Sequence, residues 1–481
     1  MTTDSLPRYG AVIGGKRIET ADHIEIIDPS TGAPCARVAR GSAAEIDLAV
    51  ADARTAFTTV WRSTSAADRA AICRAMAGLI LDRSAELADL ETTDTGKPIS
   101  QAREDVQVTA RYFEFYAAAA EVMFGATLPT ELGVLAFTLL EPHGVSAHIV
   151  PWNYPLQVSA RTVAVALAAG NCCVLKPAED APLTPLRLGE LALEAGFPPG
   201  VLNVVPGYGP EAGAALAAHP GIDHLSFTGS REVGQLVMAS AAANIVPVTL
   251  ELGGKSPQLV FPDFPATTVP AIVAAITEHA GQNCSAGSRL LVHESVHDEV
   301  VSAVARAFET MRIGPGCDDP DLGPLISARQ RDRVLRYVEL GKQTGTLVTG
   351  GDAPAHPRGG FFVRPTLFTD VPADSRVAQE EIFGPVLCVT RFATLDEAVA
   401  LANGTSYGLA AGVWTRDVYR IHRLVRDLVA GQIFVNNYSA AGGVELPFGG
   451  CRRSGFGREK GAAALQEYVR QKAVAIVSDE R

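Results

Sequence analysis

A cysteine among small residues is the strongest candidate nucleophile in the chain. Cys284 lies in the stretch GQNCSAG, residues 281–287. Small neighbours leave the sulfur open to a substrate, and polar neighbours disfavour a thiol packed into a core. The alternative is that Cys284 is one more inert thiol, because the chain has eight cysteines.

Two further motifs offer a base and a hydrogen-bond donor. Glu251 lies between two leucines in TLELGGKSP, residues 249–257, and apolar surroundings raise the pKa of a carboxyl group towards the range of a general base. Asn153 lies in PWNYP, residues 151–155, where the prolines fix the backbone so that the amide can hold a developing oxyanion. The simpler alternatives are a solvated glutamate at a strand end and a structural asparagine.

Two turns after apolar strands could bind a dinucleotide. In FTGSREVG, Gly229 and Ser230 precede a helix, whose free N–H groups and dipole attract a pyrophosphate. In LKPAED, Lys176 and Glu179 follow an apolar strand, and a carboxylate there can bind ribose hydroxyls and repel a 2′-phosphate. The second turn favours NAD over NADP, although each turn alone is also compatible with ordinary turn or surface chemistry.

The composition limits the class of protein. The chain has 481 residues, 47% hydrophobic and 20% charged, which is enough for more than one globular core. The net charge of −12 argues against nucleic acid and anionic membranes as partners, and no apolar run is long enough to span a bilayer. The start of the chain lacks a signal-peptide pattern, and the cysteines follow neither a disulfide nor a zinc pattern. We therefore expect a cytoplasmic protein with free thiols and no metal.

The elements that must position these residues alternate along the chain. After a short extended start, the first 125 residues are predicted to be helical, with helices opened by Ser42 and Ser65, the second reaching to about residue 96. Residues 134–150 are typical of two strands joined at 141–144. Two series of short apolar runs then alternate with helical stretches, which predicts an α/β protein with two doubly wound domains.

Seven motifs occur in the order and spacing typical of one family. Besides PWNYP, KPAE, FTGS, ELGGKSP and GQNC, they include EEIFGPV, residues 380–386, and PFGGCRRSGFGRE, residues 447–459. By these motifs the chain resembles the aldehyde dehydrogenase superfamily over nearly its whole length. It departs from the common pattern at Arg452, where many members have Lys, and at Ala178, where Ser is frequent; neither change affects the chemistry.

The resemblance implies that the protein oxidises a small aldehyde to the carboxylic acid with NAD. Cys284 would attack the carbonyl, the side chain of Asn153 and the N–H of Cys284 would hold the oxyanion, and Glu251 would activate the water that hydrolyses the thioester. The cofactor contacts implied are Lys176 and Glu179 to the adenosine ribose, Gly229 and Ser230 to the pyrophosphate, Glu381 and Phe383 to the nicotinamide ribose and ring, and Trp152 in the cleft.

The resemblance also implies a division of the chain. A Rossmann-like cofactor-binding domain is expected from residues 1–123 and 143–253, and a catalytic domain from residues 254–455. Residues 124–142 and 456–481 are expected to form a small β element for oligomerisation, in a homodimer or homotetramer.

The substrate is less well defined by the motifs. The positions that shape the family's aldehyde tunnel are Tyr154, Val158, Arg161, Asn283, Ser285 and Phe448. Arg161 is similar to the arginine of succinic semialdehyde dehydrogenases and could pair with a distal carboxylate, unless it is exposed elsewhere on its helix. Glu278 stands where those enzymes tend to have a second Arg, which argues against a close match. A carboxylate-bearing semialdehyde and an aromatic aldehyde both remain open.

Three other functions are compatible with parts of the sequence. A cysteine hydrolase would use Cys284 and Glu251 on esters without a redox step. A CoA-acylating dehydrogenase would tend to lack Glu251, so its presence favours water as the acyl acceptor. A non-catalytic dinucleotide-binding or structural protein would not need Cys284, Glu251 and Asn153 all intact.

Overall fold

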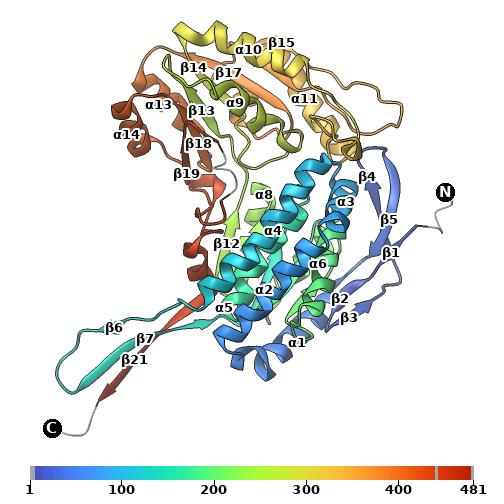
Figure 1. Ribbon diagram of the computed structural model, residues 1–481, viewed down its shortest axis with the longest axis vertical. Coiled ribbons are helices and arrows are strands. Elements are labelled where there is room, and N and C mark those ends of the chain that lie inside the picture. Colours follow the sequence, from blue (N-terminus) through green and yellow to red (C-terminus); the bar gives the residue numbers. More distant parts are fainter. Residues whose placement is uncertain (1–5, 439–442, 478–481) are drawn as a thin grey trace.

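The computed structural model describes residues 6–438 and 443–477, which form two large β-sheets with helices and a projecting β-arm (Figure 1). Beside the first large sheet lies a small three-stranded sheet in the order β1-β5-β4. Its strands are β1 (Arg8–Tyr9), β4 (His23–Asp28) and β5 (Ala33–Ala39). Within the described residues, no helix has the length and apolar character needed to cross a bilayer.

The first large sheet has the strand order β20-β12-β11-β8-β9-β10-β2-β3. Its parallel centre is formed by β8 (Val145–Ile149), β9 (Cys172–Lys176), β10 (Leu202–Val204), β11 (His224–Thr228) and β12 (Val248–Glu251), and its antiparallel edges by β2 (Ala11–Ile13), β3 (Lys16–Ile18) and β20 (Gly455–Phe456). Strands β8, β9 and β11 are buried along their whole length, as parallel strands between two layers of helices must be.

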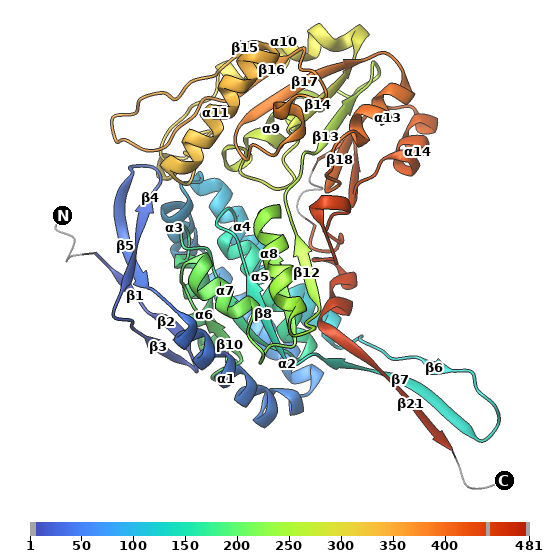
Figure 2. The same ribbon diagram turned by 180° about the vertical axis from the view of Figure 1, so that it is seen from behind.

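Helices lie on both sides of this sheet, as the two opposite views show (Figures 1 and 2). They are α1 (Ala43–Thr59), α2 (Ala66–Asp82), α3 (Ser84–Thr95), α4 (Ile99–Ala120), α5 (Pro155–Ala169), α6 (Leu183–Glu194), α7 (Ala214–Ala217) and α8 (Arg231–Ala242). The predicted capping box at Ser42 is confirmed, since its hydroxyl accepts from the N–H of Ala44 and its own N–H donates to Glu45. The prediction of one helix from Ser65 to about residue 96 is wrong, because Arg83 leaves helical geometry at ψ 18° and a new helix begins.

The second large sheet has the strand order β15-β16-β17-β14-β13-β18-β19. Its strands are β13 (Pro257–Val260), β14 (Arg289–His293), β15 (Thr346–Thr349), β16 (Thr366–Thr369), β17 (Val386–Phe392), β18 (Ala410–Trp414) and β19 (Gln432–Val435), parallel except for the edge strand β15. Its helices are α9 (Thr268–Thr277), α10 (His297–Glu309), α11 (Ala328–Thr344), α12 (Arg376–Gln379), α13 (Leu395–Asn403) and α14 (Val418–Asp427). Leu290 of β14 joins the cluster of α9 and α10, and Leu291 joins the cluster of α13 and α14. Because successive strand residues face opposite sides, helices cover both faces, and the predicted doubly wound fold is confirmed.

The arm is a three-stranded antiparallel sheet that projects from the rest of the molecule (Figure 2). It consists of β6 (Thr127–Leu128), β7 (Val134–Pro142) and β21 (Val469–Val477). The prediction of two strands at 134–150 is confirmed, but they are not a paired unit: β7 pairs with β21 and β6, and β8 lies in the first large sheet. The chain turns at Gly144, whose φ of +137° suits glycine. After the second large sheet, the chain returns to the first one, because β20 pairs with β12.

Candidate active site

A cavity of about 950 Å³ lies where strand ends of the first large sheet meet loops of the second. Thr228 ends β11 and Glu251 ends β12, and both line the cavity. The loop after β8, from Pro151 to Tyr154, forms another part of the wall. The second sheet contributes the loop that carries Cys284. In α/β proteins the carboxyl ends of parallel strands are the usual place for a ligand, and the first large sheet presents such ends to the cavity, whereas the second sheet contributes segments that precede its strands β14 and β17.

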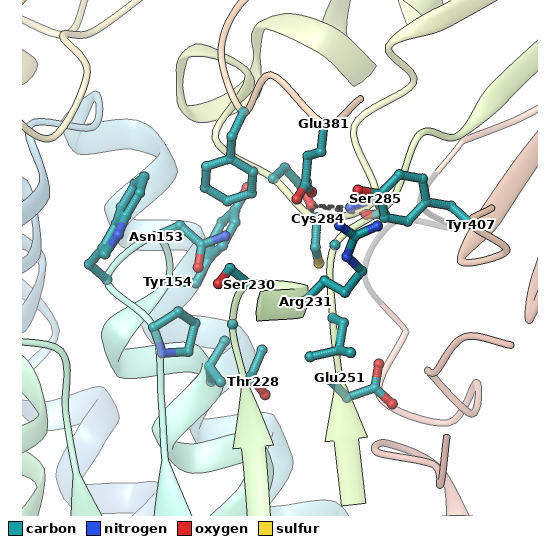
Figure 3. A pocket seen from close by; sticks show the side chains of 18 of the residues that line it. Asn153, Tyr154, Thr228, Ser230, Arg231, Glu251, Cys284, Ser285, Glu381 and Tyr407 are labelled. Atoms are coloured by element: carbon teal, nitrogen blue, oxygen red, sulfur yellow. Dashed lines mark hydrogen bonds between the residues drawn. The ribbon is translucent and has the colours of Figure 1, made fainter. Parts of the chain in front are cut away.

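Cys284 lies in a loop just before β14, and its side chain points into the cavity (Figure 3). The loop approaches its surroundings closely, since a Cβ on Gly281 would lie 2.4 Å from the carbonyl oxygen of Gly384. Burial raises the pKa of the Cys284 thiol to about 12. The thiol is therefore protonated at neutral pH and must lose its proton when it attacks.

Asn153 lies beside Cys284 in the same cavity and is 4% exposed. Its side-chain amide donates one hydrogen bond, 2.9 Å long, to the carbonyl oxygen of Gln282. An amide NH₂ group has two hydrogens, so the second remains for a substrate oxygen. The rigid turn predicted from PWNYP is present, with Pro155 as the first residue of α5.

Glu251 is the last residue of β12 and is 1% exposed. Neither carboxyl oxygen has a hydrogen-bond partner among the described residues. Burial raises its pKa well above the usual value, and the nearby carboxylate of Glu459 adds to the effect. In Figure 3 the carboxyl group is turned away from the sulfur of Cys284, so a bridging water or a rotation of the side chain must connect the two groups.

The cavity also has the features needed for a dinucleotide. Ser230 caps the N-terminus of α8 by accepting a 3.3 Å hydrogen bond from the N–H of Val233, and the first turn of α8 lines the cavity. Gly229 leaves no room for a side chain, since its Cβ would lie 2.7 Å from the ring of Phe227. The N–H of Gly229 itself donates to the carbonyl of Glu251. A pyrophosphate therefore fits best at the N–H groups of α8, with glycine allowing the close approach.

Glu381 and Phe383, predicted for the nicotinamide ribose and ring, and Trp152, predicted for the cleft, lie in the wall of the same cavity. The rings of Trp152 and Phe383 meet edge to face with centroids 5.3 Å apart. Glu381 accepts a 3.0 Å hydrogen bond from the N–H of Gly254, and burial raises its pKa to about 7. All three predicted residues line the cavity, which has the room and the polar groups for a nucleotide.

Lys176 and Glu179 are adjacent to each other but do not line the cavity. Their side chains form an ion pair with 3.2 Å between Nζ and Oε2, just beyond β9. Burial lowers the pKa of Lys176. The structure therefore brings this pair together at a strand end of the same sheet, outside the wall shared by Cys284, Asn153 and Glu251.

Arg161 is buried, so the alternative of an exposed Arg161 is wrong. Its Nε lies 2.5 Å from Oε2 of Glu459, and its guanidinium lies over the ring of Phe448 at 4.9 Å. The hydroxyl of Tyr154 donates a 2.9 Å hydrogen bond to Glu278. The cavity wall includes every position expected for the substrate tunnel: Tyr154, Val158, Arg161, Asn283, Ser285 and Phe448.

Some residues around the cavity were not predicted from the sequence. Gln330 and Arg333 of α11 donate to the backbone carbonyls of Phe383 and Glu381, each at 2.7 Å. Both are polar residues on an amphipathic helix and belong to none of the seven motifs, so nothing in the sequence singled them out. Glu459 belongs to the motif PFGGCRRSGFGRE, but no role was predicted for it. In the structure it forms an ion pair with Arg161, which lines the cavity. The described residues contain no cluster of three or more metal-binding side chains.

Comparison with known proteins identifies close relatives over almost the full length. Residues 17–474 match the model of the "Aldehyde dehydrogenase family". The hydroxyisobutyraldehyde dehydrogenase of Mycolicibacterium austroafricanum is 44% identical over 456 residues, which cover 94% of this chain and 90% of that protein. The NAD+ complex of an aldehyde dehydrogenase from Bacillus cereus has a TM-score of 0.96 and 40% identity, and the match covers 98% of this chain and 96% of that chain. The indole-3-acetaldehyde dehydrogenase AldA of P. syringae, solved with NAD+ and IAA, matches with the same TM-score, identity and coverage.

Proposed function

The chain belongs to the aldehyde dehydrogenase family and is an NAD-dependent aldehyde dehydrogenase, and from this premise we propose that Cys284, Asn153 and Glu251 carry out its chemistry. The observation that carries the proposal is that these three side chains line one cavity, which thus contains a thiol, an amide and a carboxyl group. Cys284 adds to the aldehyde carbon, and the free amide hydrogen of Asn153 and the N–H of Cys284 stabilise the oxyanion.

The thiol proton has to leave as the sulfur attacks. Since burial raises the pKa of Cys284, the acceptor must itself be a good base in the same cavity. Glu251 is buried and its pKa is raised, so it takes this proton directly or through water. NAD, when bound, supplies the hydride acceptor that leaves Cys284 carrying a thioester.

Glu251 then serves the second half of the reaction. The proton taken from the thiol first passes to solvent, so that Glu251 can remove a proton from a water molecule, which attacks the thioester carbon and displaces the sulfur of Cys284; the proton on Glu251 then returns to that sulfur. The carboxylic acid is released and the thiol is regenerated. The unpartnered oxygens of Glu251 support this role, because a carboxylate already held by the protein would be a poorer base.

Two substrate classes remain within the proposal. Arg161 in the cavity wall supports an aldehyde that also carries a carboxylate. The aromatic rings in the wall, from Tyr112, Tyr154, Phe434 and Phe448, support an aromatic aldehyde. A relative from P. syringae is named for indole-3-acetaldehyde, an aldehyde that carries an aromatic ring.

NAD is preferred over NADP in this proposal because of Glu179. Its carboxylate at the end of β9 would bind the adenosine ribose and repel a 2′-phosphate. The 3.2 Å ion pair with Lys176 supports the expectation, since it holds the carboxylate in place.

We also propose a homodimer or homotetramer built through the arm. Several apolar residues on the arm are exposed in the described part of the chain: Leu128, Leu132, Leu135, Leu139, Ile476 and Val477. An exposed apolar surface of this kind is typical of an interface. The expected division into a cofactor domain (1–123, 143–253), a catalytic domain (254–455) and an oligomerisation element (124–142, 456–481) belongs to the same proposal, as does the cytoplasmic location.

The test of the proposed function is to follow absorbance at 340 nm with butanal and NAD, and to identify the acid product. Wild type should produce one NADH per butanoic acid. Cys284→Ala should abolish both products while retaining NAD binding in a titration. Ester turnover without any aldehyde oxidation would instead favour a cysteine hydrolase.

A further inference from the structure

Three consecutive residues ahead of Cys284 have a left-handed backbone. His279 has φ 46° and ψ 41°, Ala280 has φ 53° and ψ 35°, and Gly281 has φ 72°. Glycine adopts this conformation freely, but in His279 and Ala280 the Cβ comes too close to the following carbonyl oxygen, which makes the conformation unfavourable. Two such residues in succession persist only where the surrounding structure holds them.

The left-handed turn of residues 279–281 is directly followed by the segment that carries the reacting thiol. The carbonyl oxygen of Gln282, the next residue, accepts the 2.9 Å hydrogen bond from the side chain of Asn153. The side chain of Gln282 donates to the carbonyl oxygen of His279 at 3.1 Å. Cys284 is two residues further on, so a change in the turn would move the thiol relative to the amide of Asn153.

The start of the turn is held by a hydrogen bond to α4. The side-chain oxygen of Gln101, in the first turn of α4, accepts a 3.0 Å hydrogen bond from the N–H of His279. The imidazole of His279 does not replace this contact, because it is 1% exposed and neither ring nitrogen has a hydrogen-bond partner among the described residues. Gln101 thus joins a helix of the first large sheet to the segment of the predicted nucleophile.

The same end of α4 also contacts the turn through Tyr154. Nζ of Lys97, just before α4, lies 4.3 Å from the ring centroid of Tyr154 and is held by an ion pair with Glu91 at 3.1 Å. The ring of Tyr154 meets the imidazole of His279 edge to face, with centroids 5.6 Å apart. Because Tyr154 directly follows Asn153, the start of α4 contacts both loops that carry the predicted chemistry.

We propose that Gln101 is a positioning residue for the reaction. By accepting from the N–H of His279 it keeps the left-handed turn in place, and the turn sets the position of Cys284 relative to Asn153. Gln101 belongs to none of the seven motifs and does not line the cavity, so it acts through the turn alone. The inference rests on the proposed function and adds a residue to it.

The test measures the rate of the chemical step in single turnovers. Enzyme with saturating NAD is mixed in excess over butanal, at a concentration that saturates the rate, and NADH formation is followed at 340 nm. The rate constant is then independent of the folded fraction, so a misfolded subpopulation does not imitate a misplaced nucleophile. The Tm and the Kd for NAD are measured on the same samples.

Three substitutions separate the hydrogen bond from the strain. Gln101→Met has a similar length but no acceptor. Gln101→Asn stays polar, but its shorter side chain draws the oxygen away from the N–H, and it carries the test if Gln101→Met does not fold. Ala280→Gly removes the Cβ from the second residue of the turn and is combined with each of the other two.

The control is Asn403→Leu. The side chain of Asn403, at the end of α13, accepts a 2.8 Å hydrogen bond from the N–H of Val429 and donates a 2.9 Å one to the carbonyl oxygen of Asp427, and it does not line the cavity. The substitution removes contacts of the same kind without touching the turn. It should lower the Tm and leave the single-turnover rate and the Kd for NAD unchanged.

Gln101→Met and Gln101→Asn should slow the single turnover by about tenfold or more, because small displacements of reacting groups have large effects on rate. The Kd for NAD should stay unchanged. Ala280→Gly should restore most of the rate in both variants, since glycine adopts the left-handed conformation without support.

Three results would overturn the inference: wild-type rates in the Gln101 variants, a loss that Ala280→Gly leaves in full, or an equal loss in Asn403→Leu. A wild-type enzyme that oxidises butanal in each of these cases leaves the proposed function standing. No aldehyde oxidation by wild type would defeat the proposed function itself.

Discussion

The carboxyl group of Glu251 lies directly against Gly449. A Cβ on Gly449 would be 2.7 Å from Oε1 of Glu251, and the φ of Gly449 is +153°, which other residues rarely adopt. The glycine thus leaves the space in which the carboxyl group rests while it is turned away from Cys284. The motif PFGGCRRSGFGRE therefore shapes the surroundings of the predicted base.

Gly449→Ala should displace the carboxyl group of Glu251 and slow hydrolysis of the acyl-enzyme. We expect the steady-state rate to fall by about tenfold or more, because a misplaced base loses part of its contribution. The first turnover of NADH should be affected less. Stopped-flow absorbance at 340 nm separates the two phases.

The control for this variant is Gly196→Ala. Gly196 has a φ of +98°, and a Cβ there meets nothing within 4 Å. It carries a similar backbone strain away from Glu251, so it should reduce stability but not the rate of hydrolysis. Equal steady-state losses in both variants would contradict the role given to Gly449.

Arg161→Ala should strongly destabilise the fold. It leaves Glu459, which is fully buried, without its ion-pair partner, and breaking a buried pair costs about 3–5 kcal/mol in the free energy of unfolding. Urea unfolding measures the change. The exposed pair of Arg376 and Glu380 offers the comparison: Arg376→Ala should change the free energy of unfolding far less, because water screens an exposed ion pair. Similar losses from the two variants would show that the pair of Arg161 and Glu459 is not structurally important.

Glu179→Gln should weaken the preference for NAD. Removing the carboxylate removes the repulsion of a 2′-phosphate and leaves Lys176 without its 3.2 Å partner. The ratio of kcat/KM for NAD to that for NADP should fall by about tenfold. The control is Glu190→Gln. Glu190 pairs with Arg187, three residues earlier on α6, so this substitution should leave the ratio unaltered. An unchanged ratio in Glu179→Gln would place the adenosine ribose elsewhere.

Alkylation of Cys284 in the absence of cofactor should accelerate with pH. Burial raises the thiol pKa to about 12, and only the thiolate reacts, so the rate should rise about tenfold per pH unit without a plateau below pH 10. Iodoacetamide labelling, followed at the Cys284 peptide by mass spectrometry, measures it. The background should be Cys317→Ser, which removes the exposed thiol. A plateau near pH 7 would mean that the free enzyme already holds a thiolate.

The sequence predicted the strands and the residues at their ends well, because these are local features. Buried runs such as β9 and β11 consist mostly of apolar or small residues, and Glu251 and Ser230 follow from their place at the end of a strand and the start of a helix. The motifs placed Cys284 and Asn153 in the same reaction before the fold brought them into the same cavity.

Contacts between distant segments could not be predicted in this way. The ion pair of Arg161 and Glu459 and the pairing of β7 with β21 join parts of the chain that are far apart in sequence. Residues 134–150 contain two strands, but only the tertiary fold assigns them to different sheets. The break at Arg83 was missed because the neighbouring residues are good helix formers and the interruption is a single residue.

The proposed reaction passes through a covalent acyl intermediate at Cys284. In Glu251→Gln, hydrolysis of that intermediate should be slowed more than its formation, because a thiol loses its proton more readily than water does, so a reaction with butanal and NAD quenched in acid should accumulate it. Mass spectrometry of the peptide that contains Cys284 should then show a butanoyl group on this cysteine, in an amount close to one per active site. An acyl group on another residue, or NADH production at the wild-type rate in Cys284→Ala, would contradict the account.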